Sequence, residues 1–259
     1  MKKSFVFFDV IIGRRPYSIS IRFHNNPSWF KKDYMEFKKL LGGNLEFPIK
    51  DNYPCLNDKY DNAGTLTEHY FFLDLFVAQR IFLNKPVKHV DIASRIDGFV
   101  AHVASYREIE LLDIRAVESK ITNVKFTQLD LMDDINIPDN YCDSISCLHA
   151  LEHFGLGRYG DPLNPNGHLN GFRNITRMLK KGGRFYFAVP LGPQRIEFNA
   201  HRVFSLSYLL KLVNNDYDIE SFSYIDKGEL HTDVDLTDEM IKSSCGCKFG
   251  CAIFILIKK

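Results

Sequence analysis

The stretch that decides the fold is Val90-Asp-Ile-Ala-Ser-Arg-Ile-Asp-Gly-Phe-Val100. Its apolar start predicts a buried strand that ends near Asp91. The small residues Ala93 and Ser94 predict a tight turn, and Gly98 opens the helix that follows. A strand that ends in an acid and leads into such a turn is typical of a nucleotide-cofactor site. Ala93 and Ser94 stand where glycines are usual, so this stretch leaves open whether the chain is an enzyme or a relic.

The pattern around this stretch predicts an α/β fold. From Val87 onward, short apolar strands alternate with helical stretches, which indicates a mostly parallel sheet with helices on its faces. We expect strands at 87–92, 109–113, 124–129, 144–148, 184–189, 217–226 and 251–257. We expect helices at 65–83, 169–179 and 206–213. The last two strands suit an antiparallel pair at the edge of the sheet.

The first 60 residues differ from the rest, because they are rich in aromatic side chains and turn signals. They predict an N-terminal extension or lid, followed by a domain at 61–259. The apolar run 5–12 suits a strand better than a signal peptide, since Asp9 interrupts it and no small-residue cleavage site follows. No apolar run reaches the roughly 18 residues that span a bilayer. We therefore expect a cytoplasmic protein without membrane insertion.

Charge and cysteine content narrow the range of expected partners and ligands. The 33 Lys and Arg residues nearly balance 32 Asp and Glu residues, so the formal net charge of +1 does not favour a nucleic-acid partner. Six cysteines occur without a CxxC pair, which favours reduced structural thiols over a metal site. A small-molecule substrate is the expected partner, and the sequence does not indicate an oligomeric state.

Acidic residues follow two of the predicted strands, where open α/β sheets bind their ligands. Asp113 ends the strand 109–113, and its carboxylate can accept the protons of both ribose hydroxyls. Asp130 ends the next strand, where it can bind an adenine amino group. The alternative for each residue is a cap on the following helix.

Five segments in this order resemble the successive motifs of class I S-adenosylmethionine-dependent methyltransferases. They are Asp91-Ile-Ala-Ser94, Asp113, Gln128-Leu-Asp130, Asp143-Ser-Ile-Ser-Cys-Leu-His-Ala-Leu-Glu-His153 and Met178-Leu-Lys-Lys-Gly-Gly-Arg-Phe-Tyr-Phe-Ala-Val-Pro190. The resemblance covers about residues 85–258. It implies a Rossmann-like, mostly parallel sheet of seven strands in the order 3-2-1-4-5-7-6, with helices on both faces.

The same resemblance implies S-adenosyl-L-methionine as the cofactor. The residues that it assigns to the cofactor lie at the strand ends: Asp91, Ala93, Ser94, Arg95, Gly98, Asp113, Ile114, Asp130, Leu131, Leu148 and His149. The family pattern is acid-x-Gly-x-Gly-x-Gly, and Ala93 replaces the first glycine. At negative φ this replacement costs little, whereas at positive φ it costs on the order of 1 kcal/mol. Ser94 can still offer its backbone and hydroxyl donors to the cofactor.

A narrower similarity concerns 69–71, 89–98 and 157–162. These segments are similar to an uncharacterised methyltransferase-like group whose bacterial members often occur in surface-polysaccharide gene clusters. That similarity implies O-methylation of a small polar acceptor in capsule or lipopolysaccharide biosynthesis. The acceptor would be a sugar, a sugar nucleotide or a phosphorylated precursor.

Polar residues near the expected substrate cleft supply catalytic candidates, because a base with a near-neutral pKa speeds transfer to a hydroxyl. The catalytic candidates are His201, His153, Glu152 and Asp161. The substrate-binding candidates are Arg158, Tyr159, His168, Arg202, His69 and Tyr70. Arg158 and Arg202 can hold an anionic group. The alternatives are an ordered surface turn around Arg158, a helix N-cap at Ser205 and a core histidine at His69.

Three competing readings stay open. His149-Ala-Leu-Glu152-His153 has the spacing of H-x-x-E-H zinc peptidases, but that motif needs a helix throughout and His149 follows a strand. A nicotinamide-dependent oxidoreductase is disfavoured, because Asp91 precedes the turn where the dinucleotide fingerprint has a glycine. The replaced glycines also permit a non-catalytic binding module with a methyltransferase fold.

Overall fold

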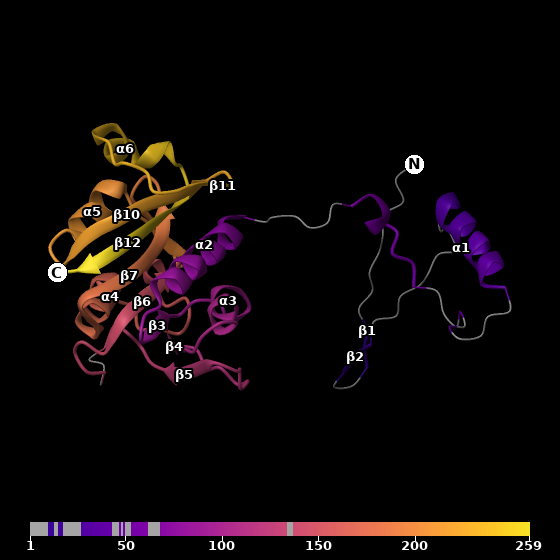
Figure 1. Cartoon of the computed structure of the whole chain (residues 1–259), viewed down its shortest axis with the longest axis horizontal. Helices are drawn as coiled ribbons and strands as arrows, with labels where there is room; N and C mark the ends of the chain where they lie inside the picture. The colour runs from indigo at the N-terminus through magenta and orange to yellow at the C-terminus, as the bar shows by residue number, and fades with distance from the viewer. Residues whose placement is uncertain are drawn as a thin grey trace. The chain divides into compact units, whose positions relative to one another are not determined.

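The computed structural model describes residues 10–12, 15–17, 27–42, 47, 49, 53–61, 68–133 and 137–259 (Figure 1). The chain divides into two compact units, Met1–Thr65 and Leu66–Lys259. Residues 5–9 of the predicted first strand and the start of the predicted helix at 65 lie outside the described residues.

The first unit contains two short antiparallel strands, β1 (Val10–Ile12) and β2 (Arg15–Tyr17), and the helix α1 (Ser28–Leu41). A 3-10 turn, η1 (Asp58–Tyr60), contacts α1 through an ion pair between Lys59 and Asp33. No described residue of α1 is buried. The lid role of this unit stays a prediction.

The second unit is built on one sheet of eight strands. These are β3 (His89–Ile92), β4 (Ile109–Asp113), β5 (Val124–Gln128), β6 (Cys142–Leu148), β7 (Leu179–Leu191), β10 (Tyr217–Asp226), β11 (Glu229–His231) and β12 (Gly250–Lys258). The strands β3 to β7 run parallel, whereas β12 lies antiparallel to both β7 and β10. The predicted α/β class with a mostly parallel sheet is confirmed.

The sheet has eight strands, so the predicted number of seven is wrong. The sheet order is β5-β4-β3-β6-β7-β12-β10-β11, because the short strand β11 adds an eighth member beside β10. A two-residue turn connects the two strands, and Lys227 and Gly228 both have positive φ there, at 50° and 81°. Such turns match the twist of a hairpin. The Lys227-Gly228 pair is therefore the sequence signal for this hairpin, and the sequence-based prediction missed it.

Helices cover both faces of the sheet, as predicted. One face packs against α2 (Glu68–Asn84) and α3 (Ala101–Ala104), and the other against α4 (Gly167–Met178) and α5 (Leu206–Val213). Strand β7 shows why both faces are apolar. Phe185 and Phe187 pack in one core cluster, and Tyr186 and Ala188 pack in the other. This alternation is the two-residue period of a strand that is buried on both sides.

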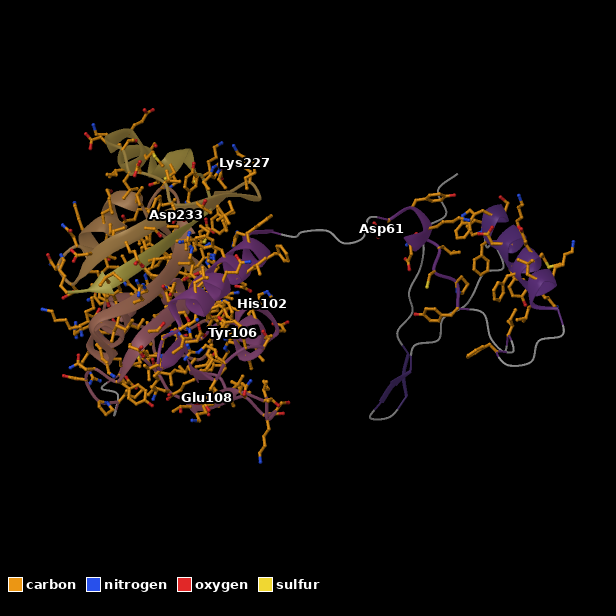
Figure 2. All side chains as sticks on the ribbon, in the orientation of Figure 1. Asp61, His102, Tyr106, Glu108, Lys227 and Asp233 are labelled. Atoms are coloured by element: carbon orange, nitrogen blue, oxygen red, sulfur yellow. The ribbon has the colours of Figure 1, made fainter. Side chains whose placement is uncertain are left out.

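The remaining elements are short. They are the kinked turn η2 (Ile96–Val100), the 3-10 turns η3 (Leu151–His153) and η4 (Ser244–Gly246), the helix α6 (Asp238–Ser243), and the strand pair β8 (Arg195–Glu197) and β9 (His201–Val203). Polar contacts tie α2 to its neighbours. Tyr106 donates to the carbonyl of Ala78, and Arg80 pairs with Asp233 (Figure 2). Within the described residues, no helix has the length and apolarity needed to cross a membrane.

Candidate functional site

A cavity of about 350 Å³ lies at the carboxyl ends of β3, β4 and β6. Open α/β sheets bind their ligands at this edge. The cavity is lined by residues 70, 74, 92–95, 112–115, 129–132, 148–150, 153, 154, 158, 159 and 161. Nearly all residues that the resemblance assigns to the cofactor meet here, namely Ala93, Ser94, Arg95, Asp113, Ile114, Asp130, Leu131, Leu148 and His149. Asp91 and Gly98 do not line the cavity.

The turn after β3 keeps the backbone of a glycine turn although its residue is alanine. Ala93 has a φ of 58°, in the left-handed region. The sequence left the sign of this angle open, and the positive value is the costly one, at about 1 kcal/mol. The Ala93 N–H donates to the carbonyl of Leu112 at 2.8 Å, which anchors the turn to β4. A strained residue that is held in place beside a cavity points to a functional backbone shape.

Asp91 is fully buried, and its hydrogen bonds lie within the protein. Its carboxylate accepts bonds from the Ser94 N–H and hydroxyl, each at 2.9 Å, and from the Ser146 hydroxyl at 2.5 Å. Burial raises the pKa of Asp91 to about 7, although these bonds favour the charged form. Asp91 and the Ser94 donors therefore satisfy each other within the protein, and their cofactor contacts stay predictions.

Gly98 has a structural role that differs from the predicted cofactor contact. It lies inside η2, where its φ of −122° and ψ of −113° interrupt the helical turn. A Cβ at this position would lie 2.6 Å from the Asp74 carboxylate on α2. Gly98 thus lets Asp74 approach the turn closely. Burial raises the pKa of Asp74 to about 6.

Asp113 lies at the end of β4 and lines the cavity, and Arg115 covers its carboxylate. Oδ1 accepts bonds from the Arg115 backbone N–H at 2.8 Å and from Nε at 3.0 Å, and Oδ2 accepts from Nη2 at 2.6 Å. The Asp113 side chain is 7% exposed, whereas the Arg115 side chain is 45% exposed. The acid that the sequence assigns to the ribose therefore holds a partner that can turn into solvent.

Asp130 and an apolar surface form the next wall. One Asp130 oxygen accepts the Met132 N–H at 2.9 Å, and the described residues 131–133 form a turn rather than the helix that the alternative role requires. Burial raises the pKa of Asp130. Ile114 and Leu131 line the cavity beside Asp130, so a flat apolar group can lie there with a carboxylate at its edge.

His149 and Glu152 form a buried pair next to the cavity. His149 Nδ1 lies 2.9 Å from Glu152 Oε1. Burial alone would lower the pKa of His149, but Cys251 and Glu152 raise it well above its usual range. His149 in turn lowers the pKa of Glu152 against the effect of burial. His149 Nε2 is buried, and Cys251 also interacts with the His149 ring. Glu152 does not line the cavity and orients His149, so its catalytic role stays a prediction.

His153, Arg158 and Tyr159 form the wall opposite β3. His153 Nδ1 lies 2.7 Å from the carbonyl of Ala200, so this nitrogen carries the proton and Nε2 is the acceptor. Burial lowers the pKa of His153, which keeps the ring neutral. Arg158 donates to the same carbonyl at 3.0 Å, and its guanidinium lies 5.1 Å from the centre of the Tyr159 ring. All three side chains line the cavity.

Two predicted site residues instead hold the loop between η3 and α4. Asp161 accepts the backbone N–H groups of Gly155, Gly157 and Tyr159. Arg202 is 5% exposed and donates to the carbonyls of Glu152, Phe154 and Pro165. These bonds occupy the Arg202 guanidinium within the protein, and its role as a substrate clamp stays a prediction. Asp161 lines the cavity, but its carboxylate shapes the loop.

His201 and His168 lie outside the cavity lining. His201 Nε2 lies 3.0 Å from Glu197, and its ring packs 5.2 Å from Phe249. His168 Nε2 lies 2.7 Å from the Tyr208 hydroxyl, and burial lowers the pKa of His168 to about 4. The structure thus does not bring His168 and His201 into the cavity lining, and the predicted substrate contact and the predicted base stay predictions. Ser205 caps α5 through the N–H of Tyr208, as its alternative role predicted.

Metal ligation has no geometric basis in the described residues, which contain no group of three or more His, Cys, Asp or Glu side chains arranged to hold an ion. In the H-x-x-E-H segment, Glu152 lies between the two histidines, 2.9 Å from His149 Nδ1 and 3.8 Å from His153 Nε2. All six cysteines are free thiols.

A family model described as "Caenorhabditis protein of unknown function, DUF268" matches residues 96–258. The chain belongs to the DUF268 family. The matched span contains Asp113, Asp130 and the loop with Arg158. Among curated proteins, no sequence matches this DUF268 chain.

Solved structures resemble the DUF268 chain at the level of fold. A 1,6-didemethyltoxoflavin-N1-methyltransferase from Burkholderia thailandensis is 13% identical, with a TM-score of 0.53 over 96% of this chain and 98% of that chain. A geranyl diphosphate methyltransferase is 11% identical, with a TM-score of 0.50 over 72% and 84%. The [4+2]-cyclase SpnF is 14% identical, with a TM-score of 0.50 over 72% and 80%. The DUF268 chain thus has the Rossmann-like fold of class I methyltransferases.

Sequence reasoning missed two charged cavity residues of this DUF268 chain. Asp74 lies one turn after Tyr70 on α2, and both residues line the cavity. An acid within the apolar run 70–78 of this helix was the available signal. Arg115 follows the strand-end acid by two residues, and only the folded chain shows that it covers Asp113. His69 packs behind the cavity, with its ring 4.8 Å from that of His149.

Proposed function

We propose that the chain is an S-adenosylmethionine-dependent methyltransferase that acts on an oxygen of a small polar acceptor. One observation carries this proposal. A single cavity at the carboxyl edge of the sheet brings together the left-handed turn at Ala93, the strand-end acid Asp113 and the apolar wall beside Asp130. These are the features that an adenosine with a sulfur-bearing side chain needs.

The residues present fit that cofactor. The cavity volume lies within the range of about 300–1,000 Å³ that is usual for small-molecule sites. Asp113 is placed to accept ribose hydroxyl protons, and Ile114 and Leu131 are placed to cover the adenine faces. Near the turn, Asp74 supplies negative charge, which favours a cationic group. When bound, the cofactor supplies a methyl group on a positively charged sulfur.

His153 is the proton acceptor in this proposal. Its Nδ1 is committed to the Ala200 carbonyl, which leaves Nε2, 3.8 Å from Glu152 Oε1, to accept a proton. Because burial lowers the pKa of His153, the ring is neutral at physiological pH and can take a proton from a hydroxyl. A positioned base of this kind contributes about 10²–10⁴-fold to the rate. His149 is charged through Glu152 and therefore binds and orients an oxygen rather than accepting its proton.

Arg158 supports an acceptor that carries an anionic group. Among the described residues, it forms no ion pair with a carboxylate, and its guanidinium lines the cavity beside His153. A sugar nucleotide or a phosphorylated precursor has such a group. The link to surface-polysaccharide biosynthesis stays a prediction, since these contacts do not distinguish a sugar from another polar acceptor.

A non-catalytic binding module is the second candidate. The observation in its favour is that Arg115 fills both Asp113 oxygens while Asp91 uses the Ser94 donors. If the bonds between Arg115 and Asp113 persist when a ligand is present, the ribose hydroxyls of the cofactor have no hydrogen-bond acceptor at Asp113. The two candidates therefore differ in whether an adenosine ligand can displace Arg115.

Calorimetric titration of the full chain with S-adenosylhomocysteine and with NAD tests the proposal. We expect S-adenosylhomocysteine to bind and NAD not to bind. Asp113→Asn should weaken S-adenosylhomocysteine binding by about 10- to 100-fold, because a charge-assisted hydrogen bond contributes about 1.5–3 kcal/mol. Asp97→Asn is the matched control, since Asp97 is an exposed acid that pairs with Arg95 nearby. The proposal fails if the wild-type chain does not bind S-adenosylhomocysteine, or if Asp113→Asn binds it normally.

A further inference from the structure

Arg115 connects three walls of the cavity. Its guanidinium holds the Asp113 carboxylate, approaches the Ala93 carbonyl at 3.5 Å and lies 4.6 Å from the centre of the Tyr159 ring. Arg158 lies 5.1 Å from the centre of the same ring. Two guanidinium groups from distant parts of the chain therefore share one aromatic ring, at a wall of the cavity.

The two arginines differ in their charge partners. Arg115 is paired with Asp113, whereas Arg158 bonds only to the neutral carbonyl of Ala200 and lies near His153. A ribose that takes the Asp113 oxygens removes the charge partner of Arg115. The contact between Arg115 and Tyr159 does not depend on Asp113. After this exchange, both guanidinium groups stand beside Tyr159 without a carboxylate.

We propose that Arg115 and Arg158 form an anion site for a phosphate-type group of the acceptor, and that cofactor binding completes this site by releasing Arg115 from Asp113. The inference rests on the proposed function and names the substrate class for it. Two guanidinium groups match a dianion better than a single carboxylate, because each can donate two parallel bonds to phosphate oxygens. No covalent step is involved, since Arg115 only exchanges one anionic partner for another.

Coupling of this kind is reciprocal. If the cofactor raises the affinity for phosphate by some factor, phosphate raises the affinity for the cofactor by the same factor. The Asp113–Arg115 pair competes with both ligands in the free protein. Its loss should therefore strengthen cofactor binding and at the same time remove the coupling.

Calorimetry with inorganic phosphate and S-adenosylhomocysteine tests the inference on the full chain. For the wild type, we expect S-adenosylhomocysteine to raise phosphate affinity at least about fivefold, and acetate to show a smaller effect. Arg115→Met should bind S-adenosylhomocysteine about two- to fivefold more tightly, as expected for loss of a half-exposed ion pair. In this variant, S-adenosylhomocysteine should no longer change the phosphate affinity, so the coupling factor should be one.

Two matched variants separate the possible failures. Arg158→Met should weaken phosphate binding without changing the affinity for S-adenosylhomocysteine alone. Arg184→Met should change neither, since Arg184 pairs with Glu220 and does not line the cavity. The inference is overturned if Arg115→Met binds the cofactor with unchanged affinity. It is also overturned if S-adenosylhomocysteine does not change the phosphate affinity of the wild type. Absence of S-adenosylhomocysteine binding to the wild type overturns the proposed function instead.

Discussion

Asp91 and Asp113 end neighbouring parallel strands, and both are buried, at 0% and 6% exposure. The carboxylate of each is fully occupied by donors from its own chain. The partners of Asp91 are Ser94 and Ser146, which are 5% and 0% exposed. The partner of Asp113 is Arg115, whose side chain is 45% exposed and can exchange its bonds for water.

This difference separates a structural acid from a ligand-facing acid. A buried serine that leaves Asp91 has no water to replace its bond, so that loss carries the full cost of an unsatisfied polar group. An arginine that leaves Asp113 becomes hydrated. Two acids in equivalent sequence positions thus have separate roles, one in building the turn and the other in facing the cavity.

The difference between Asp91 and Asp113 is tested most directly by removing each carboxylate. Asp91→Ala should destabilise the fold by about 3–5 kcal/mol, because it strands the buried donors of Ser94 and Ser146 at roughly 1–3 kcal/mol each and leaves a void. Asp113→Ala should lower the free energy of unfolding by less than about 1 kcal/mol, since water can solvate Arg115. Urea denaturation measures both. Equal losses would show that the two acids have the same role.

The pH dependence of the free energy of unfolding tests the role of Asp91 through a smaller effect. Burial raises the pKa of Asp91 to about 7, so the folded state retains a proton that the unfolded state releases at its ordinary pKa of 3.8. The contribution of Asp91 is therefore complete below pH 4 and declines as the pH rises to about 7. The slope from this residue is at most about 1.4 kcal/mol per pH unit.

Asp91→Asn is the variant that isolates this slope. Asparagine keeps the shape and cannot titrate, so the free energy of unfolding in urea should fall less between pH 5 and pH 7.5 than in the wild type. A wild-type slope that persists in Asp91→Asn would assign the titration to another group.

The sequence predicted the positions of the strand ends well, because strand periodicity and chain order determine which edge of a parallel sheet the residues share. Asp113, Asp130 and His149 meet in one cavity for this reason. The two-residue strand connection at Lys227 and Gly228 was missed, since Lys-Gly is a weak turn signal beside Asn-Gly.

Side-chain partners could not be predicted in the same way. Asp161 and Arg202 have the residue types of a site, yet backbone groups of one loop occupy them. Residue spacing does not specify whether a guanidinium meets a carbonyl or a ligand. Asp74 was missed for the opposite reason, because only the packing of α2 against Gly98 brings its carboxylate to the cavity.

The smallest expected effect concerns the turn that Asp91 holds. Ala93→Gly should stabilise the fold by up to about 0.5 kcal/mol, because relief of the left-handed conformation, at about 1 kcal/mol, exceeds the extra entropy of glycine in the unfolded chain, at about 0.5–1 kcal/mol. Ala101→Gly is the matched control, since Ala101 has a helical φ of −62° and glycine there should destabilise by about 0.5–1 kcal/mol. Urea denaturation gives both values. If Ala93→Gly loses as much stability as Ala101→Gly, the turn is not left-handed, and the case for a retained glycine-type cofactor turn is lost with it.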